Sequence, residues 1–334
     1  MERVPLGKSN LLVSRMAVGC WTFGGGEYWG EQSQKDVDAV VQAALDLGVN
    51  FFDTAEVYNE GRSEEALGNA LKGRRHEAVI LTKQFIHPDV DDTVERCEAA
   101  LKRLGTDYVD VLMIHWPVAD EAVMERVFRR HEQLKRDGKV REVAVSNFGM
   151  GQMAMMERHN FHPCTNQLHY NIASRAADKE ILPFCAEHRI GVMAYEALQQ
   201  GVLTGRYRSL DEIPPRRARY RHYRVERCKG LHDHKGEGAE EELVALLDGM
   251  REISQETGLS MVDLSLGWLV RQKGITSAIV GCRNRNQLEQ NVKGVETPID
   301  DALNERLIRL SDPLYHKLGY FADYLKGPEN PRVW

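Results

Sequence analysis

Side chains with acid–base chemistry recur where short apolar runs of the sequence end. Asp53 closes the run 50–53, Lys83 follows the run 78–82, and His115 follows the run 109–114. Tyr58 lies five residues beyond Asp53, close enough to fold back over the same point. A free tyrosine has a pKa of about 10, a nearby ammonium lowers it, and an imidazole can hydrogen-bond a reacting oxygen. These four residue types therefore indicate proton transfer.

Each of these residues taken alone is more often structural than catalytic. Buried charges need partners, so Asp53 and Lys83 could be a structural pair, and a lone histidine at a strand end is often a satisfied polar group. The functional interpretation depends on their coincidence at successive strand ends.

The runs belong to a regular alternation of short β-branched segments with longer amphipathic ones. Strands are expected at 16–19, 50–53, 78–82, 109–114, 142–145, 164–168, 191–195 and 276–280. Helices are expected at 34–47, from 63 onward, and at 92–104, 121–137, 150–159, 176–188, 240–257, 261–272 and 286–293. Ser63 and Asn284 are expected to cap helix N-termini, and Gly105 to end a helix.

Eight strand-then-helix units predict an α/β fold, a (β/α)8 TIM barrel formed by one domain over residues 1–334. In such a barrel the chemistry collects where strands end. A doubly wound nucleotide-binding sheet is the alternative, but it requires G-x-G-x-x-G after the first strand, and that motif is absent. The run 24–26 of three glycines is interpreted as a flexible loop.

Composition narrows the class of protein. The 334 residues are 42% hydrophobic with a net charge of −6, which is typical of a globular chain with no general attraction for nucleic acid or anionic membrane. No apolar run approaches the roughly 20 residues that cross a bilayer, and no signal peptide is evident. Six cysteines without a C-x-x-C pair predict reduced thiols in a cytoplasmic protein.

Two segments depart from the alternation, and both are expected to be loops laid over the barrel. The basic segment, residues 206–235, carries a net charge of +6, and the C-terminal tail, residues 312–334, is rich in aromatic residues. The basic segment also contains four potential zinc ligands, Cys228, His232, Asp233 and His234. An arginine-rich loop is a poor cage for a metal, so no metal site is predicted.

The strand-end residues resemble the aldo-keto reductase superfamily. Residues 53–64, which read Asp-Thr-Ala-Glu-Val-Tyr-Asn-Glu-Gly-Arg-Ser-Glu, are similar to its signature. Its other motifs are matched in order by Thr82-Lys83, Ile114-His115-Trp116, Val145-Ser146-Asn147-Phe148, Asn166-Gln167, residues 201–205 and Val280-Gly281-Cys282-Arg283.

The resemblance implies an NADP(H)-dependent oxidoreductase that interconverts an aldehyde, ketone or sugar and its alcohol. It makes Tyr58 the general acid, Lys83 and Asp53 its electrostatic partners, and His115 the donor that orients the carbonyl. The implied cofactor-binding residues are Trp21, Asp53, Ser146, Asn147, Gln167, Tyr195, Leu198, Gly201, Leu203, Gly281, Arg283, Gln287 and Asn291. The implied substrate-binding residues are Trp21, Trp29, Tyr58, His115 and Trp116. The basic segment would then cover the cofactor, or else be a solvated loop.

The cofactor end departs from well-known members of that superfamily. Gly281-Cys282 stands where a Lys-Ser pair reads the 2′-phosphate, which leaves Arg283 and Arg285 as phosphate candidates. Arginine suits phosphate through its fork of donors, so NADP(H) is favoured and NAD(H) is the alternative.

Two other function classes stay open at this point. One is a redox-sensing regulatory subunit similar to potassium-channel β-subunits, and the other is an unrelated barrel lyase or isomerase. The set Asp53, Tyr58, Lys83 and His115 favours a reductase over the lyase, and measured turnover would separate a reductase from a regulatory subunit. The sequence leaves open the substrate, the oligomeric state, and whether the tail covers the substrate or docks on the barrel wall.

Overall fold

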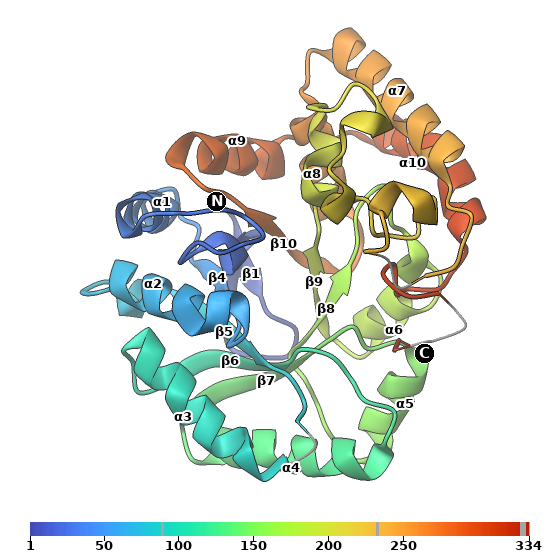
Figure 1. Ribbon diagram of the computed structural model, residues 1–334. Helices are drawn as coiled ribbons and strands as arrows, with labels where there is room; N and C mark the ends of the chain where they lie inside the picture. The colour runs from blue at the N-terminus through green and yellow to red at the C-terminus, as the bar shows by residue number, and fades with distance from the viewer. Residues whose placement is uncertain (88–89, 232–233, 328–331, 334) are drawn as a thin grey trace.

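A closed parallel barrel of eight strands forms the centre of the molecule (Figure 1). The computed structural model describes residues 1–87, 90–231, 234–327 and 332–333. The barrel order is β10-β3-β4-β5-β6-β7-β8-β9. Its strands are β3 (Met16–Gly19), β4 (Phe51–Asp53), β5 (Val79–Gln84), β6 (Val109–Ile114), β7 (Val140–Ser146), β8 (Thr165–His169), β9 (Gly191–Tyr195) and β10 (Ile275–Gly281). Each overlaps an expected run, so the predicted (β/α)8 barrel is confirmed.

The strand sequences explain why they form a barrel covered on both faces. Every residue of β4, β5, β6 and β8 is buried, as expected for strands that face a core on one side and helices on the other. The register aligns the strand ends, pairing Gly281 with Gly19, Gly19 with Asp53, and Ser146 with Gln167. Side chains that follow neighbouring strands therefore reach one mouth.

A short N-terminal hairpin closes the opposite end of the barrel, and the sequence did not reveal it. Strands β1 (Arg3–Pro5) and β2 (Leu12–Ser14) pair antiparallel. Leu6 and Leu11 are buried in one cluster with Phe51 and Val111 from the barrel interior. Strands of three residues carry too little periodicity to be recognised.

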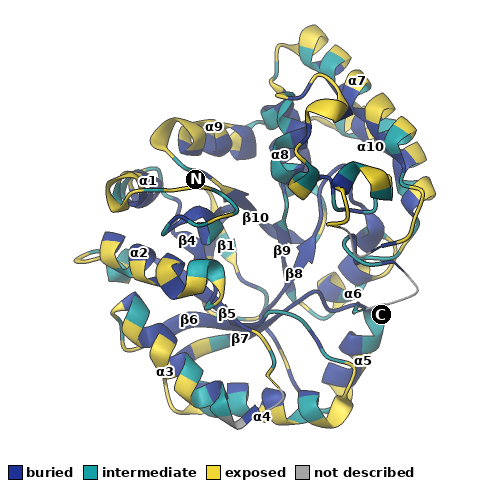
Figure 2. Ribbon diagram, viewed as in Figure 1, coloured by how far each residue is buried: buried dark blue, intermediate teal, exposed yellow. Residues whose placement is uncertain are grey.

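Ten α-helices are present in the described part of the chain: α1 (Gln34–Asp46), α2 (Arg62–Ala70), α3 (Thr93–Leu104), α4 (Glu121–Arg136), α5 (Met150–Arg158), α6 (Ile181–Glu187), α7 (Glu240–Thr257), α8 (Met261–Arg271), α9 (Arg285–Glu296) and α10 (Asp301–Leu318). Figure 2 shows buried residues on their inner faces and exposed residues outside. Helices α7 and α10 pack against each other to one side of the barrel (Figure 1). None of these described helices is long and apolar enough to span a bilayer.

Two of the three predicted helix-end residues act as expected. The Asn284 side chain accepts a hydrogen bond from the backbone N of Gln287 at 2.9 Å, and Gly105 ends α3 at φ +64°. The prediction for Ser63 is wrong, because α2 begins at Arg62. The Ser63 hydroxyl instead donates to the Cys20 carbonyl at 2.7 Å, and so ties α2 to the end of β3.

The expectation that the tail is a loop from residue 312 is wrong for its first part. Residues 312–318 complete α10, which accommodates Pro313, and the chain becomes irregular from Gly319. Tyr324 is buried between the rings of His169 and His222, at centroid distances of 4.7 and 5.1 Å. The tail is therefore anchored to the barrel. Trp334 lies outside the described residues.

The basic segment is a loop as expected, with 3-10 turns at Leu210–Glu212, Pro215–Arg217 and Val225–Cys228. It is solvated only in part, because Tyr220, His222 and Tyr223 are buried while Arg208, Arg216 and Arg224 are exposed. It also holds the tail, since the Arg221 guanidinium donates to the carbonyls of Leu318 at 2.6 Å and Phe321 at 3.0 Å. Of the four potential zinc ligands, His232 and Asp233 lie outside the described residues.

We predict that the N-terminal hairpin contributes strongly to stability. Leu6 is fully buried, so Leu6→Ala should lower the free energy of unfolding by about 2–5 kcal/mol through lost packing and a residual cavity. Leu12 on the same hairpin is 55% exposed, and Leu12→Ala should stay within about 0.5 kcal/mol of wild type. Urea denaturation measures both, and equal effects would contradict the proposed burial of the barrel end.

Candidate active site

Lys83 lies fully buried near the end of β5, and its ammonium has three hydrogen-bond partners. Nζ donates to Asp53 Oδ2 at 2.8 Å, to the Thr54 carbonyl at 2.8 Å and to Tyr58 OH at 3.2 Å. An ammonium has three N–H donors, so all are used and one points at the phenol oxygen. Burial by itself lowers the pKa of Lys83, but the Asp53 carboxylate and the Tyr58 oxygen together outweigh burial and raise it. Lys83 therefore stays charged.

The turn that carries Tyr58 is held by hydrogen bonds to the loop after β3. Asn59 and Glu60 adopt left-handed φ values of 51° and 60°. The Asn59 side chain donates to the carbonyls of Trp21 at 3.0 Å and Phe23 at 2.7 Å, which offsets this backbone strain. A Cβ on Gly26, at φ +144°, would lie 2.2 Å from Asn59 Oδ1. The glycine run 24–26 is thus required for close packing, and its interpretation as a merely flexible loop is wrong.

Tyr58 keeps its proton at neutral pH. Burial raises its pKa, and the Lys83 ammonium, which acts in the opposite direction, offsets burial only in part. The sequence correctly predicted the direction of the Lys83 contribution, but the net shift of the pKa is upward. Desolvation sets the direction of the pKa shift. Trp21 contributes to it by stacking on the phenol ring and keeping water away, at a centroid distance of 5.9 Å and an interplanar angle of 28°.

His115 is a neutral hydrogen-bonding group beside Tyr58. The two rings meet edge to face at a centroid distance of 5.9 Å, and Phe85 covers His115 at 4.5 Å. Burial and then the charge of Lys83 hold the pKa of His115 well below its usual range. A neutral imidazole offers one N–H donor but no readily released proton. Of these two groups, Tyr58 is therefore the candidate proton donor.

Polar side chains at the ends of β7, β8 and β9 connect Asp53 to Tyr195. Gln167 Nε2 donates to Asp53 Oδ1 at 2.7 Å, and Ser146 Oγ donates to the Gln167 carbonyl at 3.0 Å. Asn147 Nδ2 donates to Ser146 Oγ at 2.9 Å, and Tyr195 OH donates to Asn147 Oδ1 at 2.8 Å. The structure thus brings these predicted cofactor residues together, with much of their hydrogen bonding directed at one another.

Most of the remaining predicted cofactor residues lie on the segments that follow β9 and β10. The turn Gln199–Thr204, which follows β9, contains Gly201 and Leu203, and Leu198 directly precedes it. Gly281 is the last residue of β10, and α9 carries Gln287 and Asn291. Arg283 connects β10 to α9, and its backbone N donates to Gln287 Oε1 at 2.9 Å. The Arg283 guanidinium donates to the carbonyls of Trp29 and Glu31, so it also holds the loop after β3.

Three tryptophans predicted to bind substrate have different surroundings. Trp21 stacks on Tyr58, whereas Trp29 meets Trp21 edge to face at 5.3 Å and lies under the Arg217 guanidinium at 5.5 Å. The ring of Trp116, directly after His115, lies 3.6 Å from the guanidinium carbon of Arg332.

The sequence analysis missed two residues near the mouth, Phe85 and Arg332. Arg332 forms a two-pronged pair with buried Asp323, with contacts of 2.8 and 3.0 Å, which brings the end of the tail to Trp116. The place of Phe85 directly after β5 was a usable signal, because barrel sites collect at strand ends. Arg332 had no such signal, because its contact with Trp116 joins two segments far apart in the sequence.

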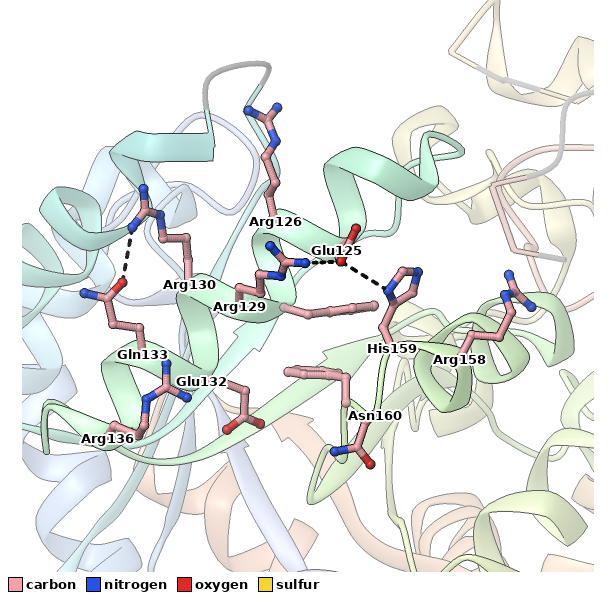
Figure 3. A pocket seen from close by; sticks show the side chains of 12 residues that line it. Glu125, Arg126, Arg129, Arg130, Glu132, Gln133, Arg136, Arg158, His159 and Asn160 are labelled. Atoms are coloured by element: carbon pink, nitrogen blue, oxygen red, sulfur yellow. Dashed lines mark hydrogen bonds and ion pairs between the residues drawn. The ribbon is translucent and has the colours of Figure 1, made fainter.

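A separate hollow of about 740 Å³ lies on the outer wall of the barrel, where α4 meets the end of α5 (Figure 3). Phe128 and Phe161 stack in it at 4.3 Å, and Arg129 is paired with Glu125. Its described lining includes none of the strand-end residues. The candidate active site therefore lies at the barrel mouth.

Comparisons with known proteins agree with this geometry. The sequence profile of the Aldo/keto reductase family matches residues 15–312. The chain is 30% identical over 309 residues to the aldo-keto reductase YhdN of Bacillus subtilis, covering 86% of this chain and 87% of that protein. It is 32% identical over 314 residues to a "Probable voltage-gated potassium channel subunit beta" of Arabidopsis thaliana, covering 89% and 92%. An aldo-keto reductase from Klebsiella pneumoniae, solved in complex with NADPH, has the same fold, with TM-score 0.72, 24% identity and coverage of 100% and 99%.

We predict that replacing only one partner of the Lys83–Asp53 ion pair strongly destabilises the protein. Lys83→Met leaves a buried carboxylate without its counterion and should lower the free energy of unfolding by about 3–5 kcal/mol. Adding Asp53→Asn removes that charge and should recover much of the loss. Urea denaturation at pH 7 compares the variants, with Arg306→Met, which breaks an exposed pair with Glu256, as a control expected to change little. A double variant no more stable than Lys83→Met would contradict this account.

Proposed function

The chain belongs to the aldo/keto reductase family, and we propose that it is an NADP(H)-dependent oxidoreductase that interconverts a carbonyl compound and its alcohol. The observation that carries the proposal is the 3.2 Å contact from Lys83 Nζ to Tyr58 OH, with Asp53 fixing the charge on Lys83. A phenol bonded to a permanent ammonium can release its proton because the phenolate that remains is stabilised.

The proposed mechanism assigns the proton to Tyr58 and the orientation of the carbonyl to His115. When bound, NADP(H) supplies the hydride to the carbonyl carbon or accepts it from the alcohol. In reduction Tyr58 gives its proton to the carbonyl oxygen as negative charge develops there, and Lys83 stabilises the phenolate. Neutral His115 donates its N–H to the same oxygen. In oxidation the phenolate accepts the alcohol proton.

The chemistry of the cofactor end fits a dinucleotide. A Cβ placed on Gly201 would lie 3.3 Å from Arg206 Cδ and 3.9 Å from Arg217 Nη1, so bare backbone and two arginines meet there, as phosphate binding requires. The N-terminus of α9, capped by Asn284, favours an anion beside Arg283. We assign the nicotinamide amide to Ser146, Asn147 and Gln167 and the support of its ring to Tyr195. These residues and the NADPH-bound fold relative favour NADP(H), with NAD(H) as the alternative.

The proposed substrates are small aldehydes, ketones or sugars. Trp21 and Trp116 offer flat apolar walls beside Tyr58 and His115, which suit sugar rings, polyols and aromatic carbonyls. A panel of these compounds, followed by the loss of NADPH absorbance, identifies the substrate class.

A redox-sensing regulatory subunit is the second candidate, because several relatives carry a channel-subunit name. The intact set Asp53, Tyr58, Lys83 and His115 favours turnover over sensing alone. Absence of turnover over the whole panel, together with tight nucleotide binding, would favour the regulatory subunit.

We predict that Tyr58→Phe removes turnover and spares cofactor binding. Loss of a general acid lowers kcat by a factor of about 100 to 10,000. Carbonyl reduction is measured by NADPH absorbance, and the Kd for NADPH by fluorescence. Tyr108→Phe, which alters a tyrosine just before β6 at the far end of that strand, is the matched control and should leave kcat unchanged.

The pH dependence provides an independent check on the role of Tyr58. Because the pKa of Tyr58 is raised and that of His115 is far below its usual range, neither group should change charge between about pH 6.5 and 9. Reduction by wild type should be level there and fall only as Tyr58 loses its proton at higher pH, whereas oxidation should rise with pH. A near-normal kcat for Tyr58→Phe, or a change of slope near pH 6.5 in the pH profile of reduction, would contradict the assignment of Tyr58 as the general acid.

We predict that Arg283 sets the preference for NADP(H). Charge-assisted bonds to a 2′-phosphate are worth about 1.5–3 kcal/mol, so Arg283→Ala should weaken NADPH by roughly one to two decades more than it weakens NADH. Fluorescence titration with both nucleotides measures this. Arg285→Ala is the comparison and should have the smaller effect, because Arg285 is exposed and paired with Glu289. Equal losses for both nucleotides would show that Arg283 acts by stacking or by anchoring the loop after β3.

A further inference from the structure

The loop between β3 and α1, residues 20–33 and here named the first loop, contacts both the turn after β9 and the segment before α9, to which the cofactor is assigned. On one side Tyr28 OH donates to Gln200 Oε1 at 2.7 Å, in the turn after β9. On the other side Arg283, before α9, binds the carbonyls of Trp29 and Glu31. The first loop is therefore fixed over the region where the proposed cofactor would lie.

The first loop also contacts the arginines of the basic segment. The Arg217 guanidinium lies 5.5 Å from the ring centre of Trp29, and that of Arg219 lies 5.6 Å from the ring centre of Tyr28. Arg217 further donates to the Gln200 carbonyl at 3.3 Å and to Tyr207 OH at 2.8 Å. Two arginines thus lie against aromatic rings of the first loop, and a third, Arg216, is paired with Glu27 of that loop.

Two hydrogen-bond donors at this junction are shielded from solvent without an acceptor. They are Trp29 Nε1 and Arg219 Nε, neither of which has a partner among the described residues. The nearby carboxyl of Glu196 accepts from Tyr220 OH at 2.9 Å and from Gln200 Nε2 at 3.0 Å. A buried N–H without an acceptor costs about 1–3 kcal/mol, so two of them in a cationic setting indicate that an anionic acceptor binds here.

We propose that the Trp29 indole N–H and the Arg219 guanidinium bind the diphosphate of the nicotinamide dinucleotide. The inference rests on the proposed function and deepens it by adding ligands from the first loop and the basic segment. The diphosphate is favoured over the 2′-phosphate because Trp29 lies between the proposed reaction centre and Arg283. The Trp29 ring contacts Trp21, which stacks on Tyr58, and the Trp29 carbonyl accepts a hydrogen bond from Arg283. Trp29 is then a cofactor ligand and not the substrate wall expected from the sequence.

The test is the variant Trp29→Phe, which keeps an aromatic ring against Trp21 and Arg217 and removes only the N–H. Isothermal titration calorimetry measures the Kd of NADPH and of NADH, which share the diphosphate and differ in the 2′-phosphate. We expect Kd to rise about tenfold for both nucleotides by the same factor. Arg219→Gln is the second variant and should also weaken both equally, which keeps the test open if Trp29→Phe fails to fold.

The matched control is Tyr28→Phe, which loses the bond to Gln200 but keeps both donors. It should change Kd much less than Trp29→Phe, and thermal unfolding without nucleotide should be the same for the two variants. An unchanged Kd in Trp29→Phe, a loss confined to NADPH, or an equal loss in Tyr28→Phe would each overturn the proposal. Wild-type protein that binds neither nucleotide would overturn the proposed function itself, a result distinct from these.

Discussion

An ammonium that is shut off from water must be satisfied by the protein, and the candidate active site is built around this requirement at Lys83. Its three donors reach Asp53, Thr54 and Tyr58, all supplied by the end of β4 and the turn that follows. Asp53 uses its second oxygen on Gln167 from β8. One carboxylate can bind side chains from β5 and β8 only because the sheet closes into a barrel with its strand ends level. Loss of that closure would separate Gln167 from Asp53 and leave one oxygen of a buried carboxylate without its donor.

The same burial gives the three groups around the mouth different charge states. Lys83 has the Asp53 carboxylate in contact and stays charged. Tyr58 stays neutral because burial outweighs the effect of Lys83, and His115 stays neutral because burial and Lys83 act in the same direction. The result is a charged donor fixed beside a protonated phenol and a neutral imidazole. This is the distribution that carbonyl reduction by proton and hydride transfer needs, because only one of the groups can release a proton.

The segments outside the strand–helix alternation are held mainly by arginines bound to backbone carbonyls. Arg283 binds the first loop, Arg217 the turn after β9, and Arg221 the tail. A guanidinium has five donors in a rigid fork, so one side chain can fix an irregular backbone that lacks regular partners. The positive charge of the basic segment therefore has a structural use in addition to the proposed binding of phosphate.

The sequence by itself determined the eight strands, the barrel and the positions of Asp53, Tyr58, Lys83 and His115, because apolar runs, helix periods and strand ends are local features. Tertiary structure alone decided the partners of these residues. Gln167 and Asp53 are 114 positions apart, and no local pattern specifies their hydrogen bond. The hairpin under the barrel, the role of Ser63 and the contact of Arg332 with Trp116 likewise depend on distant segments. The sign of the pKa shift at Tyr58 belongs with them, since desolvation follows from the packing of the whole mouth.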